Sequence, residues 1–288
     1  MEETFDFGSQ DLDNLIVKDK KFYAERRKKC LLICIPILLV IATALVLYFI
    51  LKPKEDNKII CRYETKEDNE NVILINIDDN IEFIVIIDDV KYDKKNYHNF
   101  EKAGKHKVIF EFENKLNSLE NFFEGNKYII DADFSNLQTE NIKSMENLFK
   151  DCAYLTNVNF DNKTPNLENI RNMFFRCSLL KEVKTNFDTL KVERMDYMFY
   201  GCDSLTYLDI SNFNLENLKY STQMFAYCIN LTEIKFNDYT STKNLETMES
   251  MFEKCESLKT INTQIFKENK IRNLNDVFKD CTSLRELQ

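Results

Sequence analysis

The sequence predicts an α/β solenoid with a short helix and a short parallel strand in each repeat, preceded by a small β module and a single N-terminal transmembrane helix. A period of 25 to 27 residues runs through the C-terminal half, and a run of 22 uncharged residues lies near the N-terminus. Internal periods of this length indicate stacked repeats. A hydrophobic content of 44%, with 4 Gly and 3 Pro, is typical of a folded chain rather than a disordered one.

The first 51 residues predict a membrane anchor. Residues 30–51, CLLICIPILLVIATALVLYFIL, carry no charge, and as a helix they would span roughly 33 Å. Basic residues are denser before this segment than after it, which predicts a cytoplasmic tail over residues 1–29 and a C-terminal part that is extracellular or lumenal, most naturally at the plasma membrane. The alternative is a cleaved signal peptide, for which the basic leader is long.

Residues 52–118 predict a linker and a small β-rich module without repeats. Apolar and polar residues alternate over residues 73–77, 83–87 and 108–112, a pattern typical of short strands. Paired aspartates at 78–79 and 88–89 separate these runs. We interpret them as solvated turns, with calcium ligation as the alternative.

Residues 119–288 repeat about seven times. A phenylalanine lies three residues before each repeat cysteine and a leucine three residues after it. A further copy precedes them, with Phe123 in phase and Asn126 in the cysteine position. The structural ladder comprises Phe149, Cys152, Phe174, Cys177, Phe199, Cys202, Phe225, Cys228, Phe252, Cys255, Phe278 and Cys281.

Each repeat contains two patterns. Residues 195–202 place apolar side chains at i, i+3, i+4 and i+7, which predicts one face of a two-turn helix. Residues 205–210 then alternate, as on a strand. Because no single repeat can bury its apolar face, neighbouring repeats are expected to stack.

The string MFYGCDSLTYLDISNF, residues 198–213, resembles the repeat of BspA-like leucine-rich repeat surface proteins, with its Met-Phe-x-x-Cys-x-x-Leu-x-x-Leu signature. The repeats at Lys184-Thr185 and Asn262-Thr263 depart from this pattern. The resemblance implies a curved α/β solenoid with parallel strands on one face. It also implies adhesion or recognition at a cell surface, without naming a ligand.

The cysteine ladder has four interpretations. A zinc site needs clustered ligands, and a catalytic thiol needs a neighbouring base; the chain's two histidines, His98 and His106, precede the repeats. Disulfides between repeats are possible by distance, but equivalent side chains in a stack point the same way. Buried free cysteines are the favoured interpretation. We expect no catalytic residue, no metal and no cofactor.

Outward strand positions are the predicted partner-binding surface, because mixed charges, amides and a tyrosine suit a protein or glycan. The alternatives are merely solvated residues, or a scaffold or coat protein that self-associates through the solenoid. A net charge of −9 argues against a nucleic-acid partner. The candidate residues are Asn157, Asn159, Glu182, Lys184, Tyr207, Asp209, Glu233, Lys235, Thr260 and Asn262, with Glu286 and Gln288 at the next repeat.

Two further features are predicted on the repeats. Asn162 and Asn230 begin N-glycosylation sequons, and Asn162 is the more favourable of the two because it lies in a predicted loop. The printed chain stops at Leu287-Gln288, directly after a predicted strand. We therefore expect an open strand edge there, or a continuation of the repeats.

Overall fold

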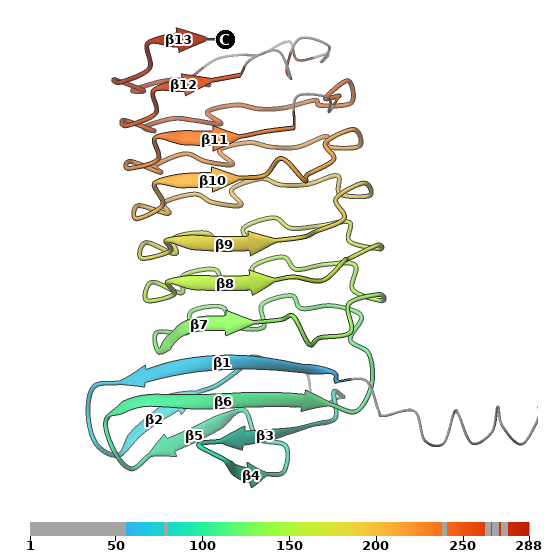
Figure 1. Ribbon diagram of the computed structural model, residues 1–288, viewed down its shortest axis with the longest axis vertical. Helices are drawn as coiled ribbons and strands as arrows, with labels where there is room; N and C mark the ends of the chain where they lie inside the picture. Colours follow the sequence, from blue (N-terminus) through green and yellow to red (C-terminus); the bar gives the residue numbers. More distant parts are fainter. Residues whose placement is uncertain are drawn as a thin grey trace, which may run out of the picture. The chain divides into compact units, whose positions relative to one another are not determined.

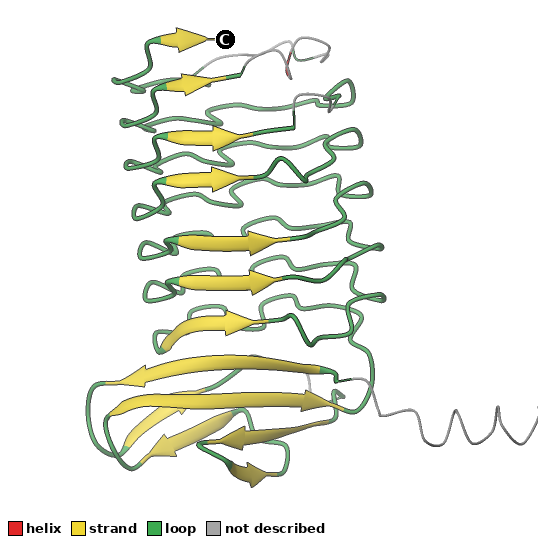
Figure 2. Cartoon of the chain, viewed as in Figure 1, coloured by secondary structure: helices red, strands yellow, loops and turns green. Residues whose placement is uncertain are grey.

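The computed structural model describes residues 56–77, 80–237, 241–262, 266, 271 and 276–287, and Asp56–Gln288 form one compact unit. Its regular elements are strands joined by turns and loops (Figure 2). The first six strands, which we call the β module, are β1 (Lys58–Thr65), β2 (Glu70–Ile73), β3 (Phe83–Ile87), β4 (Val90–Tyr92), β5 (Tyr97–Phe100) and β6 (Gly104–Phe112). The strands of the following coils, residues 119–287, which we call the repeat stack, are β7 (Ile129–Asp133), β8 (Asn157–Phe160), β9 (Glu182–Thr185), β10 (Tyr207–Asp209), β11 (Glu233–Lys235), β12 (Thr260–Ile261) and β13 (Glu286–Leu287).

One sheet joins the β module to the repeat stack. Its strand order is β4-β3-β6-β1-β7-β8-β9, antiparallel as far as β7 and parallel from β7 to β9. Further along, β10 pairs with β11 and β12 with β13, also in parallel, so the strands of successive coils lie one above another on one side of the stack (Figure 1). The antiparallel pair β2-β5 forms a separate sheet. Strand β1 therefore covers the edge of the first coil's strand, which would otherwise be unpaired.

The predicted α/β solenoid is wrong, because the described residues of the repeats contain strands and turns but no α-helix. In the coil of residues 195–202, Tyr197 and Gly201 have positive φ values of 56° and 68°, which a right-handed helix cannot contain. The N–H groups of Tyr197, Phe199 and Gly201 donate to carbonyls of the next coil, at 2.8 to 2.9 Å. The segment is a series of linked turns.

The same linked turns recur in every coil of the stack. Two residues four positions apart have left-handed backbone in each coil, at 121 and 125, 147 and 151, 172 and 176, 197 and 201, 223 and 227, 250 and 254, and 276 and 280. Between Tyr197 and Gly201, the N–H groups of Met198 and Tyr200 bond three residues back, to the carbonyls of Met195 and Tyr197. Linked turns thus bring apolar side chains at i, i+3, i+4 and i+7 inward, as a helix would, so the sequence pattern alone does not distinguish them.

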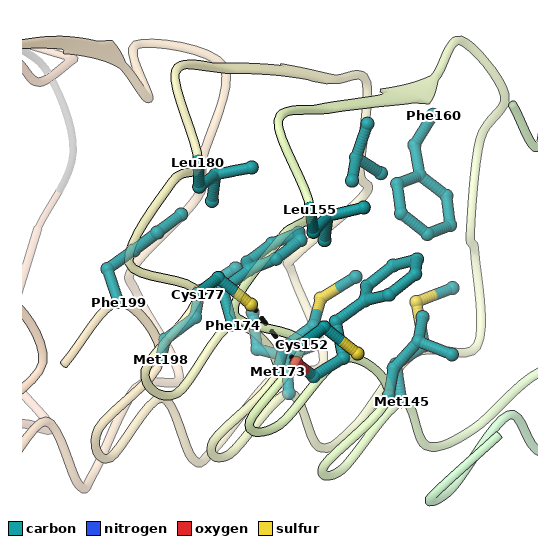
Figure 3. Packing of buried hydrophobic residues seen from close by; sticks show 14 of the residues in the cluster. Met145, Cys152, Leu155, Phe160, Met173, Phe174, Cys177, Leu180, Met198 and Phe199 are labelled. Atoms are coloured by element: carbon teal, nitrogen blue, oxygen red, sulfur yellow. Dashed lines mark hydrogen bonds between the residues drawn. The ribbon is translucent and has the colours of Figure 1, made fainter. Parts of the chain in front are cut away.

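The core of the stack is a column of phenylalanine rings. Neighbouring rings lie 5.3 to 5.8 Å apart at interplanar angles of 5° to 14°, in the order Phe123, Phe149, Phe174, Phe199, Phe225, Phe252 and Phe278. The cysteines and leucines of successive coils point into the same interior (Figure 3). Repetition in the sequence therefore becomes contact between copies of the same side chain.

The predicted strands of the β module are partly observed. Strands β3 and β6 cover the predicted alternations at 83–87 and 108–112, whereas β2 ends at Ile73, where a strand was predicted to begin. Strand β1, at the centre of the sheet, was not predicted. Its inward residues Ile59, Cys61 and Tyr63 are fully buried.

The predicted transmembrane helix at 30–51 and the tail at 1–29 lie outside the described residues. In the part of the chain that the structure does describe, no helix is long and apolar enough to cross a membrane. The described residues therefore do not support the prediction of a single-pass membrane protein with an extracellular or lumenal repeat domain, and we do not retain it.

Candidate functional site

The six repeat cysteines bond adjacent coils together. Each Sγ lies 2.9 to 3.2 Å from the carbonyl oxygen of the ladder phenylalanine in the preceding coil, and each thiol is free. Burial raises the pKa of each of these thiols, to about 11 for the partly exposed Cys281. Thiols that stay protonated at neutral pH are poor nucleophiles and metal ligands. Their geometry here is that of hydrogen-bond donors inside a core.

Asn126 explains why the first coil lacks a cysteine. Its amide nitrogen donates to the carbonyls of Ile73 and Leu74, at 3.0 and 3.1 Å, while its side-chain oxygen accepts from the N–H groups of Tyr128 and Ile129. The β module, rather than another coil, precedes this position. A longer side chain with two donors therefore bonds the end of strand β2 to the stack.

The predicted partner-binding residues form two outward columns on the strands, which we call the strand face. Asn157 lies opposite Glu182 on paired strands, and Tyr207 lies opposite Glu233. Thr260 and five other members of the set also occupy outward positions, with exposures from intermediate to exposed: Asn159, Lys184, Asp209, Lys235 and Asn262. Gln288 lies outside the described residues.

Charges on the strand face are largely matched within it. The carboxylate of Asp209 accepts from the Ser211 hydroxyl at 2.6 Å and lies 3.2 Å from Lys235 Nζ. Partial burial alone would raise the pKa of Asp209, but the bonds from Ser211 and Lys235 lower it below its ordinary value. Lys184 lies 3.6 Å from Glu182. The face is polar and of mixed sign, without a strong field of either sign.

The two sequon asparagines differ in their environment. The amide nitrogen of Asn162 donates twice, to the carbonyls of Phe134 and Leu137 at 2.9 and 2.8 Å, and Thr164 is fully buried. Asn230 is exposed and its nitrogen donates once, to the Asp203 carbonyl at 2.8 Å. A glycan on Asn162 would replace an N–H that bonds two coils, so the geometry favours Asn230, the reverse of the order predicted from sequence.

A second group of exposed side chains was not predicted from sequence. Phe175, Tyr197, Tyr200 and Tyr227, which we call the aromatic cluster, lie in the linked turns and are each partly exposed. The sequence signal was present: in two coils an aromatic residue directly follows the ladder phenylalanine, as Phe175 follows Phe174. This position falls off the face of a helix, so the helix prediction hid it.

A groove of about 860 Å³ lies where the β module meets the first coil. Ile73, Ile75, Tyr97 and Phe122 contribute to its lining. Nothing in the described residues completes a metal site, because no group of three or more His, Cys, Asp or Glu side chains is placed to hold an ion. Of the aspartate pairs, 78–79 lie outside the described residues, and Asp88 bonds the Lys107 N–H and His106.

The fold defines a repeat protein whose coils each contribute one short strand and a set of linked turns. The profile of a family described as "Mycoplasma protein of unknown function, DUF285" matches residues 117–239 and 235–287. This covers more than half of the chain, and the chain belongs to that family. Neither the curated proteins nor the solved structures contain a match.

Proposed function

We propose that this chain is a non-catalytic recognition protein that binds a protein or glycan partner through its strand face. The observation behind this proposal is the contrast between uniform interior and varied exterior positions. At the ladder positions phenylalanine, cysteine and leucine recur coil after coil. The first outward position changes in the order asparagine, glutamate, tyrosine, glutamate and threonine.

A purely structural stack has no need for this variety. Stacked coils favour identical neighbours, as the phenylalanine column demonstrates. Varied outward residues on a regular framework make a surface that can match one partner's shape and polarity, as repeat proteins commonly do. The resemblance of residues 198–213 to BspA-like leucine-rich repeats supports the same proposal, because that family's role is adhesion or recognition.

The chemistry of the face favours a protein or a glycan. Tyr207 is 45% exposed, and its hydroxyl lies 3.4 Å from the Asp209 carboxylate. Partly exposed tyrosines combine apolar contact area with a polar edge and lose little conformational entropy on binding. The matched charges around Tyr207 offer hydrogen bonds without attracting a polyanion.

The test is a binding screen of the full chain against protein and glycan arrays, followed by affinity measurements on the strongest hits. Tyr207→Ala is expected to weaken binding by about tenfold or more. Tyr97→Ala, an exposed tyrosine on the β module, is the matched control and should leave the affinity unchanged. Partners whose affinity is unchanged both by Tyr207→Ala and by charge reversal at Glu233 and Lys235 would contradict the proposal. Self-assembly of the chain at micromolar concentration, lost with these same changes, would instead favour a scaffold.

A further inference from the structure

The aromatic cluster is a continuous set of rings across three neighbouring coils. The rings of Phe175 and Tyr200 are 4.9 Å apart and nearly parallel, at 13°. Tyr227 continues the series 5.1 Å from Tyr200, and Tyr197 lies 6.1 Å from Tyr200. All four rings are partly exposed, whereas the ladder phenylalanines of the same coils are fully buried.

Flanking coils use the same position differently. Directly after the ladder phenylalanine, Lys150 pairs with Glu124 at 2.6 Å, and Lys279 pairs with Glu253 at 3.2 Å. Between these two ion pairs, the position holds Phe175, then Tyr200, then the buried Ala226, which Tyr227 directly follows. Along the stack, this position thus changes from solvated ion pairs to aromatic rings, whose apolar surface is stabilised when a partner buries it.

Two cations border the rings. The guanidinium of Arg176 lies 5.0 Å from the ring centre of Phe175, and Lys254 Nζ lies 5.0 Å from that of Tyr227. Within the described residues neither cation lies at ion-pair distance from a carboxylate, unlike Lys150 and Lys279. Each keeps its positive charge available at the edge of the cluster.

The two cations and Tyr227 share one left-handed backbone position of the repeat. Arg176, Tyr227 and Lys254 have φ values of 57°, 63° and 58°, in the region that glycine occupies at least cost. Gly201 fills the equivalent place beside Tyr200 with φ 68°. Asp151 and Asp280 hold the same left-handed position in other coils, so this conformation is general to the stack, and the long cationic and aromatic side chains are what distinguish the position at the cluster.

We propose that the aromatic cluster binds an extended acidic segment of a partner protein. An apolar side chain of the segment would pack on Tyr200 and Tyr227, and two carboxylates would reach Arg176 and Lys254. These cations belong to coils three steps apart, roughly 14 Å at the spacing of neighbouring strands. An extended segment spans that distance between residues four positions apart, so the proposal specifies the spacing of the acids.

Nearby aliphatic side chains favour a peptide over a sugar. Leu179 and Ile229 are 40% and 37% exposed and lie four residues after Phe175 and two after Tyr227, in the turn that follows the ladder cysteine. Exposed aliphatic surface suits apolar peptide side chains. This site is separate from the strand face, and it goes beyond the function proposed above.

The probe is a fluorescein-labelled, end-capped peptide, Asp-Ser-Leu-Ser-Asp, with Asn-Ser-Leu-Ser-Asn as its uncharged match. Fluorescence anisotropy with the full chain at low ionic strength should show roughly tenfold tighter binding of the acidic peptide, since two exposed ion pairs each contribute a few-fold. Replacing both cations (Arg176→Gln with Lys254→Gln) should abolish this preference. Tyr200→Ala should weaken both peptides by about tenfold.

Two controls separate this proposal from the strand-face proposal and from misfolding. Tyr207→Ala should leave peptide binding unchanged, and circular dichroism should report the same fold for every variant. If Tyr200→Ala proves unfolded, the double cation variant, which alters the exposed Arg176 and the partly exposed Lys254, still decides the outcome. Equal binding of the two peptides, binding of neither, or a preference that survives loss of both cations would overturn the proposal.

Discussion

The β module and the repeat stack bury phenylalanines in different ways. In the module, long antiparallel strands bring Phe83, Phe110 and Phe112 together with rings tilted by 42° and 57°. In the stack, strands of two to five residues suffice, and the ladder rings are nearly parallel. The β module is stabilised by long antiparallel strand pairs, and the repeat stack by the same ring-on-ring contact repeated from coil to coil.

The junction shows what this difference requires. A coil in mid-stack bonds its predecessor through a thiol and a phenylalanine carbonyl, whereas the first coil meets a strand of different geometry. Asn126 replaces the thiol there, and β1 pairs with β7 in antiparallel orientation. The β module therefore ends the stack in the way that capping units end other repeat proteins.

The largest expected effect is in the interior of the stack. Phe199→Ala should destabilise the chain by about 3–5 kcal/mol, because it leaves a cavity between two stacked rings. Urea denaturation followed by circular dichroism measures the loss. Tyr207→Ala on the strand face of the same repeat should change stability by no more than about 0.5 kcal/mol. Similar losses for both variants would contradict the division into interior and exterior.

A smaller effect is expected at the junction. Asn126→Ala removes two donated and two accepted hydrogen bonds at a buried site and should cost about 1–3 kcal/mol. Asn166→Ala is the matched control: it removes one donated bond, to the Glu140 carbonyl of the preceding coil, and one accepted bond, from Lys191 Nζ, and should cost less because the site is more exposed. If Asn126→Cys restored full stability, the module would be acting as another coil, and the comparison would fail.

The last prediction needs no mutation and compares the rates at which two ladder cysteines, Cys281 and Cys202, are labelled. Iodoacetamide reacts with the thiolate, so the rate at Cys281, whose pKa is raised to about 11, should rise about tenfold per pH unit up to that value. Cys202 is fully buried, and burial raises the pKa of its thiol further. It should react only when the chain is unfolded. Mass spectrometry of labelled peptides resolves the two sites, and equal native rates would refute the burial of the ladder.

Sequence reasoning identified the columns and missed the shape of the turns. The spacing of Phe199 and Cys202 defines an inward face whether the backbone is helical or turned, because linked turns reproduce the helical spacing. Left-handed residues such as Asn147, Asp151 and Arg176 are of types that also occur in helices, so their conformation was not evident. The aromatic cluster was hidden for the same reason, since Tyr200 falls off the face of the predicted helix.

Period and register follow from the sequence by itself, because recurring phenylalanine, cysteine and leucine must face one interior for any of them to be buried. Only the tertiary structure decided how each coil turns, since the left-handed residues are held by N–H groups that find their acceptors in the next coil. It also decided the role of Asn126, whose partners Ile73 and Leu74 lie more than 50 residues earlier in the chain. The sequence of one coil does not show which hydrogen bonds it makes to its neighbours, and these bonds between coils stabilise linked turns instead of the predicted helix.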